Sequence, residues 1–338
     1  MSSIALSPRA RREVGRRLLG PGSGIAGFLA VICIVTAAVT PAFGSGSNWY
    51  DIANQTVFVG ILAVGMTVVL ISGGIDLSVG ATLGLCGGVV AYLMERGVGM
   101  PLAFAAALAV GAGIGLVNGL LITKLHIPDF IATLAMLGVA RGLLFVWTSG
   151  IPFVDYLNNA YYKIGGLQRL FWEITVPMVV AIAVAVGVGL MLRFTAFGRH
   201  VYGIGSNRDA ARLSGVRVDR VRIAVYVLSG LLAAVAGILL AGRLTTVQPD
   251  LGSGYELNAI AAAVMGGAAL AGGRGRVIGA ALGALALTVI QNIINISNID
   301  PNWEPIVIGC ILLLAVMADR VGDVALARVT RRWRQVGA

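Results

Sequence analysis

Few side chains in this sequence could carry out covalent chemistry. Its only two lysines, Lys124 and Lys163, do not follow a glycine, whereas a nucleotide-binding P-loop needs Gly-Lys-Ser/Thr so that the lysine reaches the phosphates. Its two histidines, His126 and His200, lie near no group of cysteines or carboxylates, which argues against a transition-metal site. We therefore expect no catalytic residue, no metal and no cofactor in this chain.

Two charged residues in or beside apolar segments could instead serve a mechanism. Arg141 lies within one such segment, with no carboxylate of that segment in reach, and we expect it to bond backbone carbonyls of another helix. Asp76 lies where another segment begins, so we expect it to cap free backbone N–H groups, with a transport role as the alternative. Glycines beside it could form a hinge. The hinge candidates are Gly73, Gly74, Asp76, Gly272 and Gly273.

Uncharged polar side chains form a third group, of which Gln291, Asn292 and Asn295 make a stripe on one apolar segment. Hydrogen bonds between helices explain such a stripe, and a lining for a neutral hydroxylated solute explains it equally well. The candidates for a solute path are Asn54, Gln55, Asn118, Asn258, Gln291, Asn292 and Asn295.

The elements that must position these residues are membrane helices. Of the 338 residues, 58% are hydrophobic and only 12% are charged, about half the charged fraction of a soluble domain. A membrane span needs about 20 mostly apolar residues, and ten segments approach this, although 255–273 is rich in glycine and 304–318 is short. They are 24–43, 52–72, 76–95, 101–123, 128–149, 173–193, 221–244, 255–273, 277–297 and 304–318.

The basic residues predict how these spans are oriented. With both termini in the cytoplasm, 20 of the 25 lysines and arginines fall on the cytoplasmic side, as the positive-inside rule requires. The net charge of +10 is thus explained by topology rather than by nucleic-acid binding. We expect a basic tail at 1–23 leading into an uncleaved first helix, a membrane domain at 24–318 and a second basic tail at 319–338.

Glycines repeat at a spacing of four, as in Gly80, Gly84 and Gly88, which predicts helix faces where backbones approach closely. The second and third spans also match the eighth and ninth at a fixed offset of 199, including Gly80 with Gly279 and Gly84 with Gly283. Both hairpins run in the same direction in this topology, so we predict a parallel internal repeat.

The cytoplasmic loop 194–220 contains a short predicted helix. Ser206 followed by Asp209 resembles a capping box, Gly215 is placed to end the helix, and about eight residues cannot form a stable helix alone in water. This element either docks on a partner protein or lies on anionic lipid headgroups. The assigned docking residues are Ser206, Asn207, Arg208, Asp209, Ala211, Arg212, Leu213, Ser214 and Gly215.

Several stretches give the chain a resemblance to a known family. They are GMTVVLISGGIDLSVG at 65–80, FIATL at 130–134, ARLSG at 211–215, GYELNAIAA at 254–262 and LAGGRGR at 270–276. With these motifs the chain resembles permease subunits of the ribose, xylose and autoinducer group of ABC importers. Asn258 replaces the usual aspartate of this family, and 295–305 differs from ribose permeases, so the sugar stays open.

The resemblance implies a fold, partners and a mechanism. The expected fold is an all-α polytopic protein of about ten helices in a bacterial inner membrane. The expected partners are a second permease copy or paralogue, a cytoplasmic ATPase whose two nucleotide-binding domains use ATP and Mg²⁺, and an external sugar-binding protein. The chain itself would be no enzyme and would import a monosaccharide or polyol by alternating access, with the residues of 206–215 as the coupling helix.

Two other functions remain open at this stage. An ion-coupled carrier is disfavoured because no acidic residue lies near the middle of a predicted span. A non-transporting membrane scaffold is the other. The external segment 151–172 holds six aromatic residues, among them Tyr156 and Tyr161, and forms either an interfacial belt or a surface that receives the binding protein.

Overall fold

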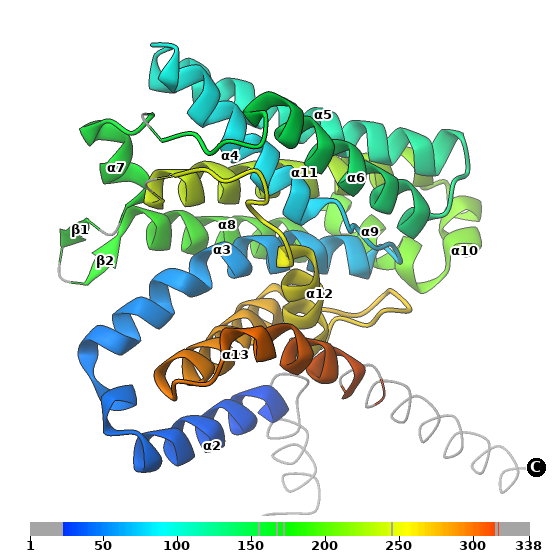
Figure 1. Ribbon diagram of the computed structural model, residues 1–338. Helices are drawn as coiled ribbons and strands as arrows, with labels where there is room; N and C mark the ends of the chain where they lie inside the picture. Colours follow the sequence, from blue (N-terminus) through cyan, green and yellow to red (C-terminus); the bar gives the residue numbers. More distant parts are fainter. Residues whose placement is uncertain are drawn as a thin grey trace, which may run out of the picture.

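A computed structural model of the chain describes residues 23–314 and Met317, except Asp155, Leu167, Trp172 and Thr245. The described residues form a bundle of long helices joined mostly by short loops (Figure 1). The predicted basic tails lie outside the described residues, apart from Ser23.

The first half of the bundle holds five helices. They are α2 (Ser23–Val39), α3 (Gly46–Ile71), α4 (Val79–Glu95), α5 (Met100–Lys124) and α6 (Asp129–Thr148), with a 3-10 turn, η1 (Pro41–Gly44), between α2 and α3. Pro101 lies in the first turn of α5, where a backbone N–H would have no partner within the helix, so its missing N–H costs no hydrogen bond. A left-handed Ser149 ends α6.

The second half alternates long helices with short elements. They are α7 (Asn159–Gly165), β1 (Arg169–Phe171), β2 (Ile174–Thr175), α8 (Val176–Phe194), α9 (Ala196–Ser206), α10 (Arg208–Leu213), α11 (Val218–Arg243), α12 (Tyr255–Met265), α13 (Val277–Ile296) and η2 (Pro301–Trp303). β1 and β2 form a small antiparallel hairpin. A further apolar helix runs through Pro301–Leu314.

Six of the described helices, α3, α5, α6, α8, α11 and α13, are long and apolar enough to cross a membrane, which confirms an all-α polytopic membrane protein. α3 and α11 form the buried centre of the bundle, and α11 packs along α5, α4 and α3. Glycine makes this possible, because a Cβ on Gly111 would lie 2.7 Å from the Cβ of Ala234 on α11. Little of α8, by contrast, is buried.

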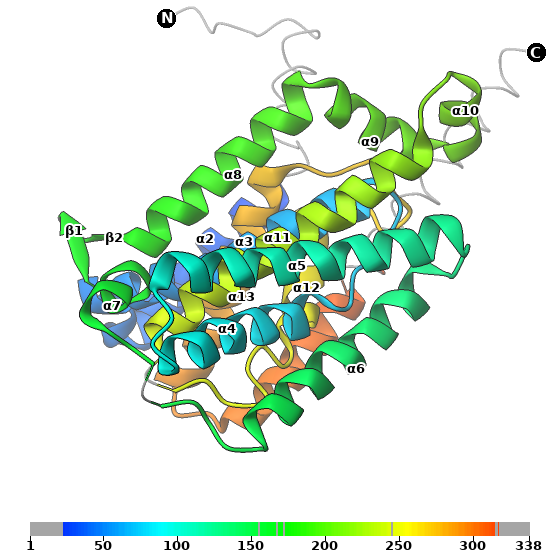
Figure 2. The ribbon, with the colours of Figure 1, turned by 90° about the horizontal axis from the view of Figure 1, so that it is seen from above.

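α10 lies at one end of the long helices, and α7, β1 and β2 lie at the opposite end (Figure 2). This arrangement agrees with the predicted placement of these segments on opposite sides of the membrane. The orientation itself and the count of ten spans stay predictions.

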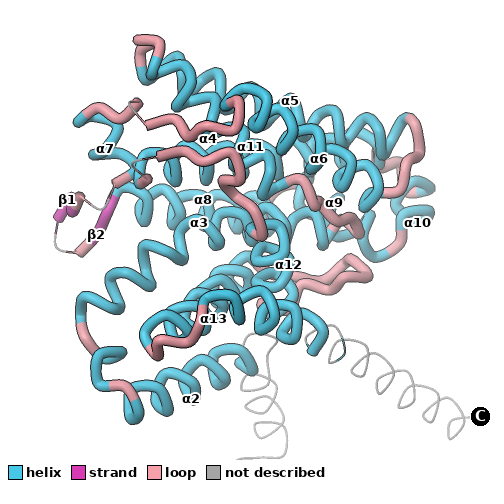
Figure 3. The backbone as a smooth tube through the Cα atoms, in the orientation of Figure 1, coloured by secondary structure: helices cyan, strands magenta, loops and turns pink. Residues whose placement is uncertain are grey.

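The predicted span 255–273 is not one continuous helix. α12 ends at Met265, so its 11 residues rise about 16 Å, half of a hydrocarbon core. Gly267, Gly272 and Gly273 have positive φ angles, a conformation that breaks a helix and costs glycine little. A long loop therefore leads from α12 to α13 (Figure 3).

The predicted internal repeat is only partly reflected in packing. The matched pairs Gly80 with Gly279 and Gly84 with Gly283 all lie against backbone carbonyls of other segments. However, α12 packs closely against α13, whereas α4 packs mainly on α11, α5 and α6 and not along α3. The two hairpins thus share glycine positions but not helix pairing, and the repeat stays a sequence prediction.

Two aromatic residues of the external segment anchor α7 rather than face the membrane or a partner. The hydroxyl of Tyr156 donates to the carbonyls of Ala241 and Leu244, and that of Tyr161 to Ile238. Both rings are buried against the end of α11. For these two residues, both predicted roles, an interfacial aromatic belt and a surface that receives the binding protein, are therefore wrong.

Candidate functional site: the coupling segment and the glycine junction

The coupling segment, residues 206–215, contains a shorter helix than predicted. α10 has six residues, and its N-cap is Asn207, whose side-chain oxygen accepts from the N–H of Ala210 at 2.9 Å. Ser206 is not the cap, because it is still the last residue of α9 and donates to the Tyr202 carbonyl. Gly215 ends the segment as predicted, with φ +84° and its N–H bonded to Arg212.

The surface of the coupling segment is dominated by Leu213, whose side chain is 90% exposed. An isolated apolar side chain so exposed at the end of a charged loop is suited to insertion into a partner's pocket. Asn207, Arg208, Asp209, Arg212 and Ser214 surround it and are also exposed. Ala211 is buried on the inner face of α10, and its predicted contact with the partner stays a prediction.

Directly before the coupling segment, Gly205 meets both predicted hinges. The N–H of Gly273 donates to the carbonyl of Ile71 at 2.9 Å, joining the α12–α13 loop to the end of α3. A Cβ on Gly272 would lie 3.0 Å from the Cα of Gly73 and 2.8 Å from the Gly205 carbonyl oxygen. We call Gly73, Gly205, Gly272 and Gly273 the glycine junction. Sequence reasoning found three of the four and missed Gly205.

Positive φ angles explain why glycine is needed on the loop side of this junction. Gly73, Gly272 and Gly273 have φ angles of +77°, +89° and +73°, which side chains with a Cβ adopt only under strain. The backbones of α9 and of two loops can thus meet without intervening side chains. α9 and the two loops are therefore in direct backbone contact.

Asp76 holds the α3–α4 loop by hydrogen bonds. Its carboxylate accepts from the N–H and the hydroxyl of Ser78, at 3.0 and 2.6 Å, and from the hydroxyl of Ser229 on α11 at 2.8 Å. It satisfies a backbone N–H as predicted, but the N-cap of α4 is Ser78. Asn118, a solute-path candidate, donates to Ser78 and so belongs to this cluster.

We expect Asp76→Ala to lower the stability of the subunit more than Ser229→Ala does. The first change removes the acceptor of three hydrogen bonds and costs about 2–3 kcal/mol, whereas the second removes one bond and costs about 1 kcal/mol. Thermal unfolding in detergent and membrane yield measure the difference. Normal yield and stability of Asp76→Ala with lost uptake would instead assign Asp76 a gating role.

A buried ion pair supports the same loop from the other side. Asp129 at the start of α6 pairs with Arg222 on α11 and accepts from the hydroxyl of Tyr226 at 2.9 Å. A Cβ on Gly74 would lie 2.6 Å from both the Asp129 carboxylate and the Tyr226 hydroxyl. The predicted hinge residue Gly74 therefore packs on this ion pair.

Arg208 connects the ion pair to the coupling segment. Although Arg208 keeps an exposed surface, partial desolvation by the neighbouring chain, and next the nearby charge of Arg222, lower the pKa of Arg208, while Asp129 acts in the opposite direction. Arg208 thus lies within electrostatic reach of both partners of the pair. No sequence pattern indicates this cluster, because Arg222 and Asp129 are 93 residues apart and each fits the end of a span.

Arg141 behaves as expected for a structural residue. It donates to the backbone carbonyls of Asp250 at 2.6 Å and Leu251 at 3.0 Å. These carbonyls belong to the loop before α12, so Arg141 ties α6 to that loop.

The solute-path candidates do not come together at one place. Asn54 accepts from Thr175, Gln291 donates to Glu304, and Asn292 exchanges bonds with Asn48 on α3. Of the other candidates, Asn258 is buried, Gln55 is half-buried and Asn295 is exposed. Hydrogen bonding between segments accounts for Asn54, Asn118, Gln291 and Asn292, and a solute-lining role stays a prediction.

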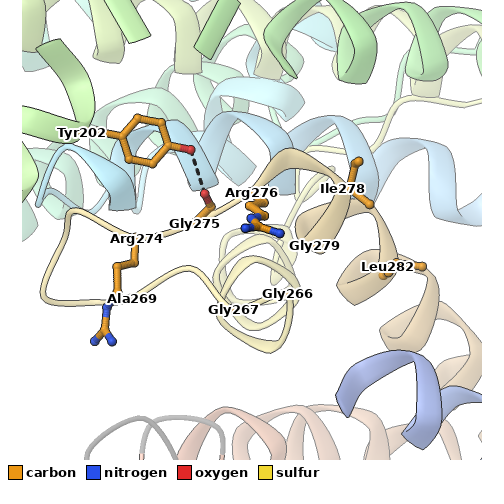
Figure 4. Close-up of a pocket in the computed structure, with 10 residues that line it drawn as sticks. All are labelled: Tyr202, Gly266, Gly267, Ala269, Arg274, Gly275, Arg276, Ile278, Gly279 and Leu282. Atoms are coloured by element: carbon orange, nitrogen blue, oxygen red, sulfur yellow. Dashed lines mark hydrogen bonds between the residues drawn. The ribbon is translucent and has the colours of Figure 1, made fainter. Parts of the chain in front are cut away.

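Two adjoining cavities lie near the glycine junction, and neither is lined by a solute-path candidate. The smaller, of about 660 Å³, is bounded by the α12–α13 loop and by Tyr202, whose hydroxyl donates to the Gly275 carbonyl (Figure 4). The larger, of about 1420 Å³, follows α3, α8 and α13. Tyr202, Arg276, Ile278 and Leu282 line both.

Comparison with known proteins places this architecture in a family. Residues 48–316 match the family described as branched-chain amino acid transport system / permease component. The ribose import permease protein of Escherichia coli K12 is 41% identical over 299 residues, which cover 86% of this chain and 91% of the relative. No solved structure matches the chain significantly.

Relatives named for other solutes are also similar. An autoinducer 2 import permease of Yersinia enterocolitica is 38% identical, with 77% of this chain and 71% of the relative covered. The L-arabinose transport permease of E. coli K12 is 36% identical, with 95% and 97% covered. These matches and the apolar helices identify a multi-pass protein of the bacterial inner membrane. The chain therefore belongs to the permease family that includes the ribose, L-arabinose and autoinducer 2 import permeases.

Proposed function

We propose that the chain is the permease subunit of an ATP-driven importer that carries a monosaccharide or related polyol into the cytoplasm by alternating access. The observation that supports this most is the match to a ribose import permease over nine-tenths of that protein's length. Ribose, L-arabinose and autoinducer 2 in the names of the relatives leave the solute of this chain open. A second permease copy or paralogue would complete the transport path.

The energy for transport would come from a separate chain. No Gly-Lys-Ser/Thr sequence occurs here, so ATP and Mg²⁺ belong to a cytoplasmic ATPase with two nucleotide-binding domains. An external sugar-binding protein would deliver the solute. The coupling segment would insert Leu213 into the ATPase and transmit its closure, through Gly205, to the α3–α4 and α12–α13 loops.

This function is tested by reconstitution. The permease is purified gently from its native membrane, the chains that accompany it are identified by mass, and the assembly is placed in vesicles with the binding protein. We expect uptake of a labelled monosaccharide that depends on ATP and resists an uncoupler. Uptake that persists without ATP and stops with the uncoupler would instead establish an ion-coupled carrier, and no uptake of any sugar tested would favour a scaffold.

We expect Leu213→Ala to reduce the copurified ATPase about tenfold, because losing one buried anchor costs about 1.4 kcal/mol or more of binding free energy. Leu213→Ala combined with changes at Arg208 and Arg212 should abolish the association. Leu102→Ala is the matched control, since Leu102 is 66% exposed at the opposite end of the bundle. Retention of the ATPase by the triple variant would show that it docks elsewhere.

A further inference from the structure

The larger cavity is an apolar groove open along one side of the bundle. Its floor includes Gly60 of α3, and its walls include Gly189 of α8 and Ala281 of α13. Along α8 the lining extends from Met178 to Phe194, a rise of about 24 Å. The groove therefore runs through most of the depth of a hydrocarbon core of about 30 Å.

Basic side chains gather at one end of this groove. Arg193 at the end of α8, Arg199 on α9 and Arg276 before α13 all line it, and among the described residues no aspartate or glutamate does. In the part of the chain that the structure describes, none of the three forms an ion pair. Their charges are thus available to a ligand.

The smaller cavity extends this basic end. It shares Arg276 and Tyr202 with the groove and is bounded by Gly266, Gly267 and Gly275 of the α12–α13 loop. Figure 4 shows Arg274 pointing away from Tyr202 and Arg276, so the three arginines of the groove supply the charge at this end. The basic end of the groove thus continues into a second recess.

We propose that this groove binds an anionic phospholipid of the cytoplasmic leaflet, with the phosphate held by Arg193, Arg199 and Arg276 and an acyl chain lying along α8. The basic end is the end of α8 nearest to α9 and α10 (Figure 2), which the arginine distribution places at the cytoplasmic surface. Anionic headgroups of that leaflet bind basic pockets between membrane helices.

Charge argues for a lipid over a second copy of this chain. A symmetric interface through this groove would bring two sets of three unpaired arginines together, and like charges placed face to face oppose association. A phospholipid satisfies both the apolar length and the positive end. This site lies on α8 and α9 and is separate from the exposed Leu213 of the coupling segment.

Native mass spectrometry of the purified subunit tests the proposal with two lipids of identical acyl chains, phosphatidylglycerol and phosphatidylcholine. We expect the wild-type protein to prefer phosphatidylglycerol at least about fivefold, which corresponds to the contribution of about one basic residue at an anionic surface. Arg193→Gln with Arg199→Gln should remove the preference. Arg217→Gln with Arg220→Gln, an equal loss of charge at the same end outside the groove, should keep it.

A second pair of variants tests the apolar part. Gly189→Phe should fill the groove and lower the binding of both lipids, because only the Cβ of Val277 lies near, at 3.9 Å. Gly187→Phe is the control on the same helix, with open space around it and no contact with the groove. Equal binding of the two lipids by the wild type would overturn the proposal. So would a dimer that Gly189→Phe dissociates without loss of lipid, which would make the groove an interface.

Discussion

Gly205→Ala is expected to lower solute uptake by the assembled importer strongly. An added Cβ would overlap the carbonyl oxygen of Ile71 and lie 2.6 Å from the amide nitrogen of Gly273. Both are backbone atoms of segments that also bond each other, so no side chain can rotate away. Such overpacking costs about 1–3 kcal/mol, and each 1.4 kcal/mol changes an equilibrium tenfold. If this cost falls on the conformational change that transport requires, ATP-dependent uptake should decrease by about fivefold to about a hundredfold.

Gly203→Ala provides the matched control for this result. Gly203 lies on the same helix, two residues away, and a Cβ there would meet nothing within 4 Å. Both changes raise helix propensity by about 1 kcal/mol, so a difference between them isolates the contact at the junction. Uptake rates are compared after equal amounts of folded subunit have been reconstituted. Normal uptake by Gly205→Ala would show that α9 does not act through these loops.

Breaking the Asp129–Arg222 pair is expected to destabilise the subunit by about 3–5 kcal/mol. The side chains are only 20% and 5% exposed, so Asp129→Ala leaves a buried guanidinium without its charge partner. Tyr226 also loses its acceptor, and the packing surface of Gly74 changes with it. Thermal unfolding in detergent should show a large decrease in Tm.

The exposed pair at the same end of the molecule supplies the comparison. Lys124 and Asp219 are 3.1 Å apart but 58% and 40% exposed, and such pairs contribute about 0–1 kcal/mol. Asp219→Ala should therefore leave Tm nearly unchanged. Replacing both buried partners, in Asp129→Asn with Arg222→Met, should cost less than either single change. Equal losses for Asp129→Ala and Asp219→Ala would contradict the buried role.

These two predictions concern one continuous path from the coupling segment into the membrane. Through the backbone, Gly205 contacts the α3–α4 and α12–α13 loops. Arg208 is within electrostatic reach of the Asp129–Arg222 pair, and Gly74 packs on that pair. If the coupling segment docks as proposed, the α3–α4 loop is linked to it both by the backbone contacts of Gly205 and by this ion pair.

The sequence by itself determined the residues that are special for local reasons. Apolar length predicted the long helices, because the hydrocarbon core admits few alternatives to a continuous helix. Gly215 ends the coupling segment because a left-handed residue is needed there. Gly73 and Gly272 each begin a pair of glycines between apolar runs, at 73–74 and 272–273. Arg141 was expected to bond carbonyls because its own segment held no carboxylate.

Only the tertiary structure decided which of these residues meet. Asn118, Ser78, Asp76 and Ser229 form one buried cluster, although they come from separate segments whose pairing no periodicity encodes. α12 ended early because several glycines took positive φ angles, which hydropathy does not report. Ala211 is buried and Leu213 is exposed, because α10 packs one of its faces against the bundle. The packing of α10, and not its sequence, determines which face that is. Composition and spacing determine only which local structure a segment adopts. The junction at Gly205 depends on three backbone segments approaching one another in space.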